Sequence, residues 1–281
     1  MQFAKVLISL LGAILGVGGL SAGSLTRTSA PLDRGYSQMY NLQFDDAHNT
    51  FRQWKSAHPE DPLGAASDAA AYLFAEFDRL HILQSEFFTH DDDFKVRVKP
   101  VADQRVKQEF LKQLDEADRL AATALSRNGG DNNAKFARIL SLGLRSDYLA
   151  LVEKRYAPSF TFMKTGRIQA MDLLSKDPSY YDAYLAVGVE NYMLGIKAAP
   201  IRWILSWAGA QTDKAQGLRE LKLTAEKGHY LEPFARLLLA VAALRDNNPN
   251  QARELLAGLS QEFPNNELYK KELARLQQGA K

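Results

Sequence analysis

One spacing recurs along this sequence and constrains its fold more than any other feature. A small residue is followed by an apolar one after four positions, another after three more, and a helix-stopping residue five beyond. Offsets of four and three place side chains on one face of a helix, and a proline just past the end cannot continue it. The copies that keep this spacing are Ala47-Phe51-Trp54-Pro59, Gly166-Ala170-Leu173-Pro178, Ala252-Leu256-Leu259-Pro264 and, with glycine as the stop, Ala117-Ala121-Ala124-Gly129. A weaker copy, Gly217-Leu221-Thr224, ends one residue early at Gly228.

Each of these helices is expected to pack on a partner helix that precedes it in the sequence. Stripes of apolar and small residues at helical spacing mark the partners, and glycine at two of them predicts a close helix approach. The stripes lie at Ala66-Ala70-Leu73-Phe77-Leu80, Ile139-Leu142-Gly143-Ser146, Tyr184-Val187-Gly188-Asn191 and within 231–244. We therefore expect about five helix pairs, with a polar closing helix over 267–277.

These features resemble the tetratricopeptide repeat, a helix-turn-helix unit with small residues at fixed points and a closing proline. The region that matches best contains Gly35, Phe44, Ala47, Phe51, Trp54 and Pro59. The resemblance implies an all-α fold, a right-handed α-solenoid of about five antiparallel helix pairs with a C-terminal capping helix. The strong copies are not spaced by a constant interval, so insertions are expected at 85–101 and 197–212.

A narrower resemblance covers residues 184–244. It is carried by Gly188-Val189-Glu190-Asn191-Tyr192-Met193, then 199–205, Gly209, 214–218 and Pro233-Phe234-Ala235. This order is similar to the middle of the tetratricopeptide-39 and inclusion-body-clearance family. The resemblance implies a repeat scaffold and nothing about compartment.

The N-terminal stretch is typical of a secretory signal peptide. Lys5 precedes an uncharged apolar run over 6–20, and small residues at Ser21 and Gly23 have the spacing of a cleavage site. The run is shorter than the roughly 20 residues that span a bilayer. We therefore expect a signal peptide over 1–23 and a helical repeat domain over 24–281, in a periplasmic or secreted protein. The alternative is an uncleaved anchor that faces the periplasm.

Composition and motifs argue against several functions. The chain has no cysteine, and its formal net charge of +2 is not that of a nucleic-acid-binding protein. The acidic cluster His90-Asp91-Asp92-Asp93 lacks the alternating oxygens and glycine of a calcium loop, so we interpret it as a solvated turn. We expect no metal, no cofactor and no enzyme; an active site assembled from scattered residues is the remaining alternative.

The leading hypothesis is an exported scaffold for protein–protein interaction, because stacked helix pairs present a shared inner surface. Four aromatic or polar residues are candidates for partner contact: Tyr148, Asn191, Trp203 and Trp207. We expect the apolar stretch Ile201–Ala208, which contains both of these tryptophans, to be a bent helix buried in an enlarged repeat. The alternative is an element that binds a partner or the membrane surface, and the N-terminal segment is a second candidate for membrane association. The alternative function is a membrane-tethered assembly factor of an envelope complex, held by the uncleaved N-terminal helix.

Overall fold

Helix is the only regular secondary structure in the described chain. The computed structural model describes residues 31–82, 101–197 and 209–278, and no strand occurs within these ranges. The all-α fold class is thereby confirmed. The helices are α1 (Pro31–Tyr40), α2 (Phe44–Ala57), α3 (Pro62–Arg79), α6 (Gln104–Arg127), α7 (Asn132–Asp147), α8 (Tyr156–Lys176), α9 (Tyr184–Gly195), α11 (Lys214–Lys227), α12 (Glu232–Arg245), α13 (Pro249–Glu262) and α14 (Glu267–Gln278), with a short π-helix η1 (Tyr148–Val152) and a 3-10 turn η2 (Tyr181–Ala183).

Several sequence predictions concern segments outside these ranges. They are the signal peptide over 1–23, the cluster His90–Asp93, and the apolar stretch Ile201–Ala208 with Trp203 and Trp207. Most of the two predicted insertions, at 85–101 and 197–212, also lies outside the described residues.

The helices end where the repeated spacing predicts. α2, α8 and α13 each end two residues before a stop proline, at Ala57, Lys176 and Glu262. α6 ends two residues before its glycine, at Arg127, and α11 ends directly before Gly228. Proline fixes the ends of α2, α8 and α13 because it disfavours helical geometry in the residue before it and donates no N–H.

Side-chain caps define several of the helix starts. The carboxylate of Asp61 accepts a hydrogen bond from the N–H of Leu63, and Pro62 occupies the first position of α3. Asn248 caps α13 in the same manner, ahead of Pro249. A capping oxygen satisfies an N–H that has no partner within the helix, and proline at the first position has no N–H to satisfy.

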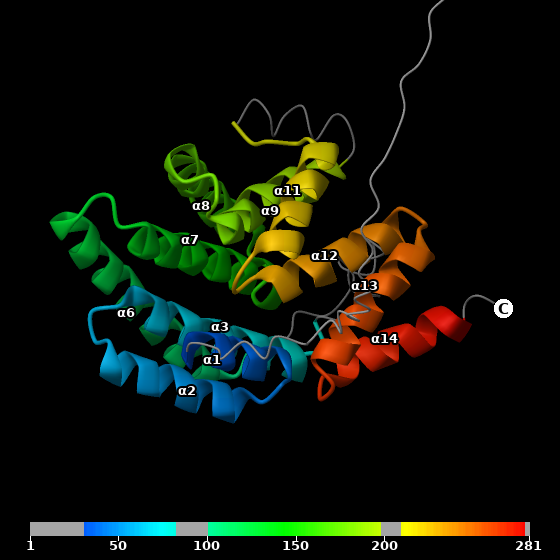
Figure 1. The fold of residues 1–281 in the computed structure, drawn as a ribbon, viewed down its shortest axis with the longest axis horizontal. Helices are drawn as coiled ribbons and strands as arrows, with labels where there is room; N and C mark the ends of the chain where they lie inside the picture. The colour runs from blue at the N-terminus through cyan, green and yellow to red at the C-terminus, as the bar shows by residue number, and fades with distance from the viewer. Residues whose placement is uncertain (1–30, 83–100, 198–208, 279–281) are drawn as a thin grey trace, which may run out of the picture.

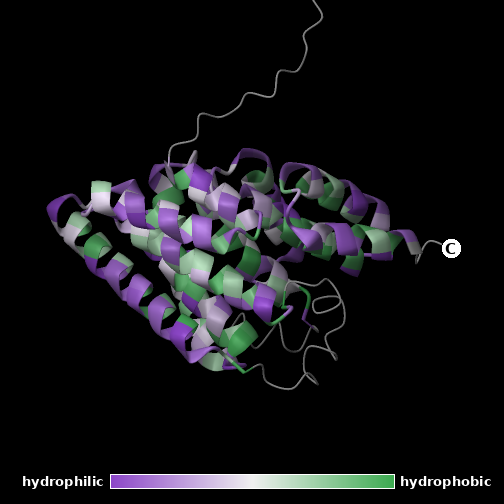
Figure 2. Cartoon of the chain, turned by 90° about the horizontal axis from the view of Figure 1, so that it is seen from below, coloured by the Kyte–Doolittle hydropathy of each residue, from purple (hydrophilic) through white to green (hydrophobic). Residues whose placement is uncertain are grey.

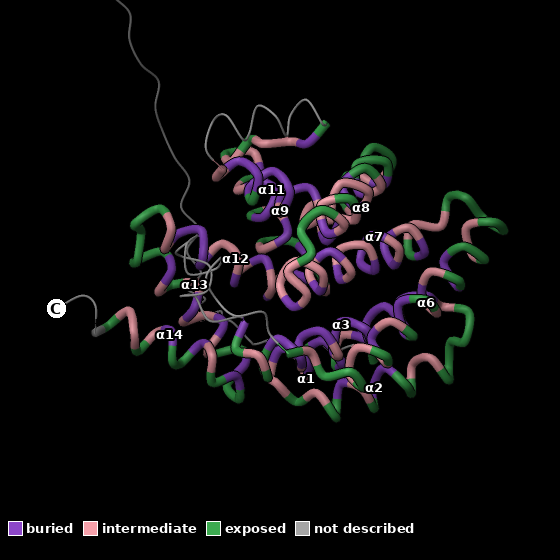
Figure 3. Tube along the Cα trace, turned by 180° about the vertical axis from the view of Figure 1, so that it is seen from behind, coloured by how far each residue is buried: buried purple, intermediate pink, exposed green. Residues whose placement is uncertain are grey.

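Most helices pack against the helices before and after them in the chain. α2 lies on α3, α3 on α6, α6 on α7, α7 on α8, α9 on α11, and α12 on α13 (Figure 1). α3 also contacts α7. Hydrophilic and hydrophobic residues alternate along these helices, as amphipathic helices with one buried face require (Figure 2). Exposed residues gather at turns such as the one between α6 and α7 (Figure 3).

Glycine brings α9 and α11 into backbone contact. A Cβ placed on Gly217 would lie 2.8 Å from the carbonyl oxygen of Gly188, and one on Gly188 would lie 2.9 Å from the main-chain nitrogen of Leu221. The expectation of close approach at Gly188 is therefore confirmed. At Gly143 the same expectation is wrong, because a Cβ there would meet no atom within 4 Å.

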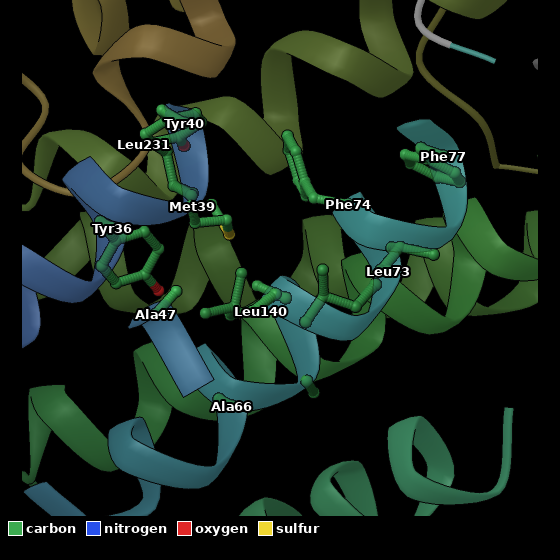
Figure 4. Close-up of a cluster of buried hydrophobic side chains, with 14 of the residues drawn as sticks. Tyr36, Met39, Tyr40, Ala47, Ala66, Leu73, Phe74, Phe77, Leu140 and Leu231 are labelled. Carbon is green, nitrogen blue, oxygen red and sulfur yellow. The ribbon is translucent and has the colours of Figure 1, made fainter. Parts of the chain in front are cut away.

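The first described helix contacts the last ones. Tyr36 of α1 stacks on Tyr230, before α12, with ring centroids 4.8 Å apart. Asn266 donates a side-chain hydrogen bond to the carbonyl of Tyr40 at 2.8 Å. The chain therefore curls round until α12 and α14 return to α1 (Figure 1). The main hydrophobic cluster lies between them, and Figure 4 shows Met39 of α1, Phe74 of α3 and Leu231 in that cluster.

Candidate functional site

A cavity of about 90 Å³ lies at the centre of the helical array. Its lining comes mainly from α1, α3, α7, α9 and α12, with two residues from α8. Most of the lining side chains are apolar, and several of them appear in Figure 4. The residues are Tyr36, Met39, Tyr40, Ala70, Phe74, Phe136, Ile139, Leu140, Gly143, Leu144, Ser146, Asp147, Met163, Gly166, Asp182, Leu185, Ala186, Val189, Leu231 and Phe234.

α7 gives the cavity both its open space and its polar end. Phe136, Leu140, Gly143 and Asp147 line the cavity at successive offsets of four, three and four, which is one face of a helix. Gly143 leaves room because nothing lies within 4 Å of the position where a side chain would begin. The apolar face of α7 thus ends at the carboxylate of Asp147, which lies beside this open space.

The carboxylate of Asp147 has no hydrogen-bond or ion-pair partner among the described residues. Burial raises its pKa from the ordinary 3.8 to about 7, and no charged neighbour contributes to that shift. The residue as a whole is nevertheless only partly buried, so the cavity approaches the surface of the protein at Asp147. A partly buried, unpaired carboxylate is costly for a fold to retain, and such groups are common at binding sites.

Asp182 is a second carboxylate in the lining, and it has a structural role. It accepts hydrogen bonds from the main-chain N–H groups of His229, Tyr230 and Leu231, at 2.9, 3.2 and 3.0 Å. Burial raises the pKa of Asp182, and the three N–H groups partly oppose that effect. This carboxylate fixes the start of α12 against η2, and its hydrogen-bonding capacity is already used by the chain.

The structure places Tyr148, a predicted partner-contact residue, in the interior. Tyr148 begins η1, is 3% exposed, and stacks on Phe110 with ring centroids 5.1 Å apart. The ammonium group of Lys107 lies 6.0 Å from the centre of its ring. Burial raises the pKa of the Tyr148 hydroxyl well above its ordinary value. In these surroundings the residue packs α6 against η1.

Asn191, the second such residue, also lies inside, where it joins α9 to α11. It is 1% exposed, and its amide donates to Glu220 at 2.9 Å and to Gln211 at 3.2 Å. Gln216 donates to the other carboxylate oxygen of Glu220 at 2.9 Å. Trp203 and Trp207, the other two candidates, lie outside the described residues.

A buried ion pair that the repeated spacing does not predict lies beside Asn191. Arg167 of α8 and Glu190 of α9 approach to 3.1 Å between Nε and Oε1, with side-chain exposures of 8% and 0%. Glu190 also accepts from the main-chain N–H of Gln211, and Arg167 donates to the carbonyl of Gly209, both at 3.2 Å. This pair therefore attaches the chain at 209–211 to α8 and α9.

The described ranges contain neither a metal-binding cluster nor a membrane-spanning helix. Within them, no group of three or more His, Cys, Asp or Glu side chains is arranged to hold a metal ion. No helix in these same ranges is long and apolar enough to cross a membrane.

Comparison with known proteins gives no match, either to models of protein families or to curated proteins.

Proposed function

We propose that this protein is an exported helical-repeat scaffold of the tetratricopeptide type, which binds a partner protein and has no enzymatic activity. In this proposal the helix pairs are α1/α2, α3/α6, α7/α8, α9/α11 and α12/α13, stacked as a right-handed α-solenoid. α14 caps the last pair. The repeated stop spacing and the resemblance of residues 35–59 to the repeat signature support this pairing.

The observation that carries the proposal is the origin of the cavity lining. The first helices of all five proposed pairs contribute to one cavity. A stack of equivalent pairs presents the same face of each first helix to a shared inner surface, and repeat proteins bind partners on such surfaces. In this chain α1 and the start of α12 occupy part of that surface. The part left for a partner is the side where α7, α8 and α9 contribute partly exposed residues.

Site-directed photo-cross-linking tests whether a partner binds there. A photoreactive residue at Met163, which lines the cavity and is partly exposed, should give a discrete cross-linked product in cells. The same group at Glu254, exposed on α13, is the matched control. The proposal predicts a product from Met163 alone. Equal labelling from Glu254, or no product from Met163, would contradict it.

Export is tested separately, by mass spectrometry of the protein recovered from cells. The proposal predicts a mature N-terminus near Ser24, with residues 1–23 removed. An intact Met1 in the membrane fraction would instead support the tethered assembly factor. A protein that stays in the cytoplasm with an intact N-terminus would contradict both.

A further inference from the structure

We propose that the Asp147 end of the central cavity binds a lysine side chain of the partner protein, with the lysine stem beside Gly143 and its ammonium group at Asp147. The inference rests on the proposed function, because it specifies the chemistry of the partner. Three properties of the cavity support it: its size, its single available charge and its opening to solvent.

The size of the cavity suits an unbranched side chain. A water-sized group requires about 10–15 Å³ of such space, so about 90 Å³ holds roughly six to nine of them. A lysine side chain has four methylene groups and one nitrogen. The space begins at Gly143, where a side chain on α7 would meet nothing, and Leu140 and Leu144 beside it are apolar. The stem of a lysine would thus replace water against apolar surface.

The charge of the cavity favours a cation. Of the two carboxylates in the lining, Asp182 is occupied by three main-chain N–H groups, whereas Asp147 has no partner in the described chain. Ser146 is occupied as well, since it donates to the carbonyl of Ser159 at 3.1 Å. An anionic ligand would be repelled, and a wholly apolar one would bury the carboxylate without compensation. An ammonium group would instead form a charge-assisted hydrogen bond with Asp147.

Lysine fits this site better than arginine. Arginine presents a planar fork of five donors, which is best satisfied by several acceptors arranged in one plane. The Asp147 end of the cavity offers one free carboxylate. A compact ammonium group on a flexible stem can be satisfied by this single acceptor group.

The Asp147 end of the cavity is accessible to a side chain from outside. Gly143, Asp147, Met163 and Phe234 are all only partly buried, although the α1 side of the same cavity is closed by the buried Tyr36 and Met39. A side chain would therefore enter between α7, α8 and α12, lie beside Gly143 and place its terminal ammonium group at Asp147.

Binding of a capped lysine to the full-length protein tests the proposal. The probe is N-acetyl-lysine methylamide, titrated while backbone amide NMR shifts are followed. N-acetyl-norleucine methylamide is the matched control, since it keeps a four-carbon stem and lacks the charge. We expect the lysine probe to shift amides of α7 and to bind at least tenfold more tightly than the norleucine probe. Equal binding of the two would overturn the proposal.

Two variants connect any binding to this site. Asp147→Asn removes the charge and should weaken lysine binding at least tenfold, while Asp45→Asn, at an exposed position on α2, should leave it unchanged. Gly143→Leu fills the cavity and should abolish binding. If Gly143→Leu fails to fold, Gly143→Ala, which meets no neighbour, should weaken binding partially. Lysine binding that Asp147→Asn leaves unchanged would overturn the proposal.

The pH dependence of lysine binding, and the binding of n-butylammonium as a second probe, complete the test. Because the pKa of Asp147 is about 7, lysine binding should weaken as pH falls from 8 to 5. The other titratable groups in the lining are Asp182 and the buried Tyr36 and Tyr40. Binding of n-butylammonium without binding of the capped lysine would mean that the site takes free amines, which overturns the assignment to a partner side chain. A Met163 cross-link without lysine binding would leave the proposed function standing and defeat this inference alone.

Discussion

The hydroxyl of Tyr40 donates a hydrogen bond to the main-chain carbonyl of Tyr230 at 3.0 Å, across 190 positions of the sequence. Tyr40 belongs to the first described helix, and Tyr230 lies in the turn before α12. The ring of Tyr40 also contacts Phe263, at the end of α13, with centroids 5.5 Å apart. One side chain thus joins α1 to the start of α12 and the end of α13, and the cavity is enclosed on that side as a result.

Removing the Tyr40 hydroxyl should weaken this closure by a measurable amount. Tyr40→Phe keeps the ring contacts and loses one buried hydrogen bond, which corresponds to about 1 kcal/mol of unfolding free energy. Tyr40→Ala also loses the ring and should cost about 3–5 kcal/mol. Urea denaturation measures both. Tyr184→Phe, at a partly buried tyrosine of α9, is the control and should leave the free energy of unfolding nearly unchanged. If Tyr184→Phe lowered that free energy as much as Tyr40→Phe does, the result would argue against a specific role of the Tyr40 hydroxyl in the closure.

Alanine at two helical glycines should have opposite effects. At Gly217 the new methyl group would lie 2.8 Å from the carbonyl oxygen of Gly188, a backbone atom that cannot move aside cheaply. Gly217→Ala should therefore destabilise the protein by about 1–3 kcal/mol. Gly143→Ala meets no atom within 4 Å and should stabilise it, by up to about 1 kcal/mol, because alanine favours helix. Thermal unfolding of the two variants gives the comparison, and losses of similar size would contradict it.

The buried pair Arg167 and Glu190 should show strong coupling. Arg167→Met or Glu190→Gln alone leaves one buried charge without its partner and should cost about 3–5 kcal/mol. The double variant should cost less than the sum of the two, since no charge remains unpaired. A double-mutant cycle by urea denaturation measures the difference. The exposed pair Asp172 and Lys176 on α8 is the control, where little coupling is expected; additive losses at Arg167 and Glu190 would contradict the prediction.

The helix boundaries could be predicted from the sequence because they depend on local chemistry. A proline or glycine ends a helix wherever the chain lies in space, so Pro59, Pro178 and Pro264 mark ends that the structure places two residues earlier. The spacing within α7 also identified a helix, but it could not show what faces Gly143. The same glycine on a helix can admit a neighbour, as Gly188 does, or leave open space.

The site depends on contacts between residues far apart in the sequence, which periodicity does not reveal. Tyr148 and Asn191 have the side chains of contact residues, yet packing against Phe110 and pairing with Glu220 bury them. Asp147, in contrast, could have been identified from the sequence pattern alone. It continues the stripe of Phe136, Leu140 and Gly143 at helical spacing, and a charged residue that ends an apolar stripe breaks the local pattern, as functional residues often do.

The pH dependence of stability tests whether Asp147 is the unpaired carboxylate described above. Its pKa is raised from 3.8 in the unfolded chain to about 7 in the folded protein, so the folded state holds this proton more tightly. Its contribution to stability is therefore complete below about pH 4 and is lost as pH rises through 7. Asparagine resembles the protonated acid and does not titrate. Asp147→Asn should match the wild type in stability at pH 4 and exceed it at pH 8.

The expected gain at pH 8 is about 1–2 kcal/mol. Each pKa unit corresponds to about 1.4 kcal/mol, and the partial exposure of this residue reduces the full effect. Urea denaturation of both proteins at pH 4, 6, 7 and 8 measures the difference, in which the titration of every other group cancels. A difference that stays constant over this range, or that favours the wild type at pH 8, would mean that Asp147 has a partner in solution. The carboxylate would then be unavailable for a lysine.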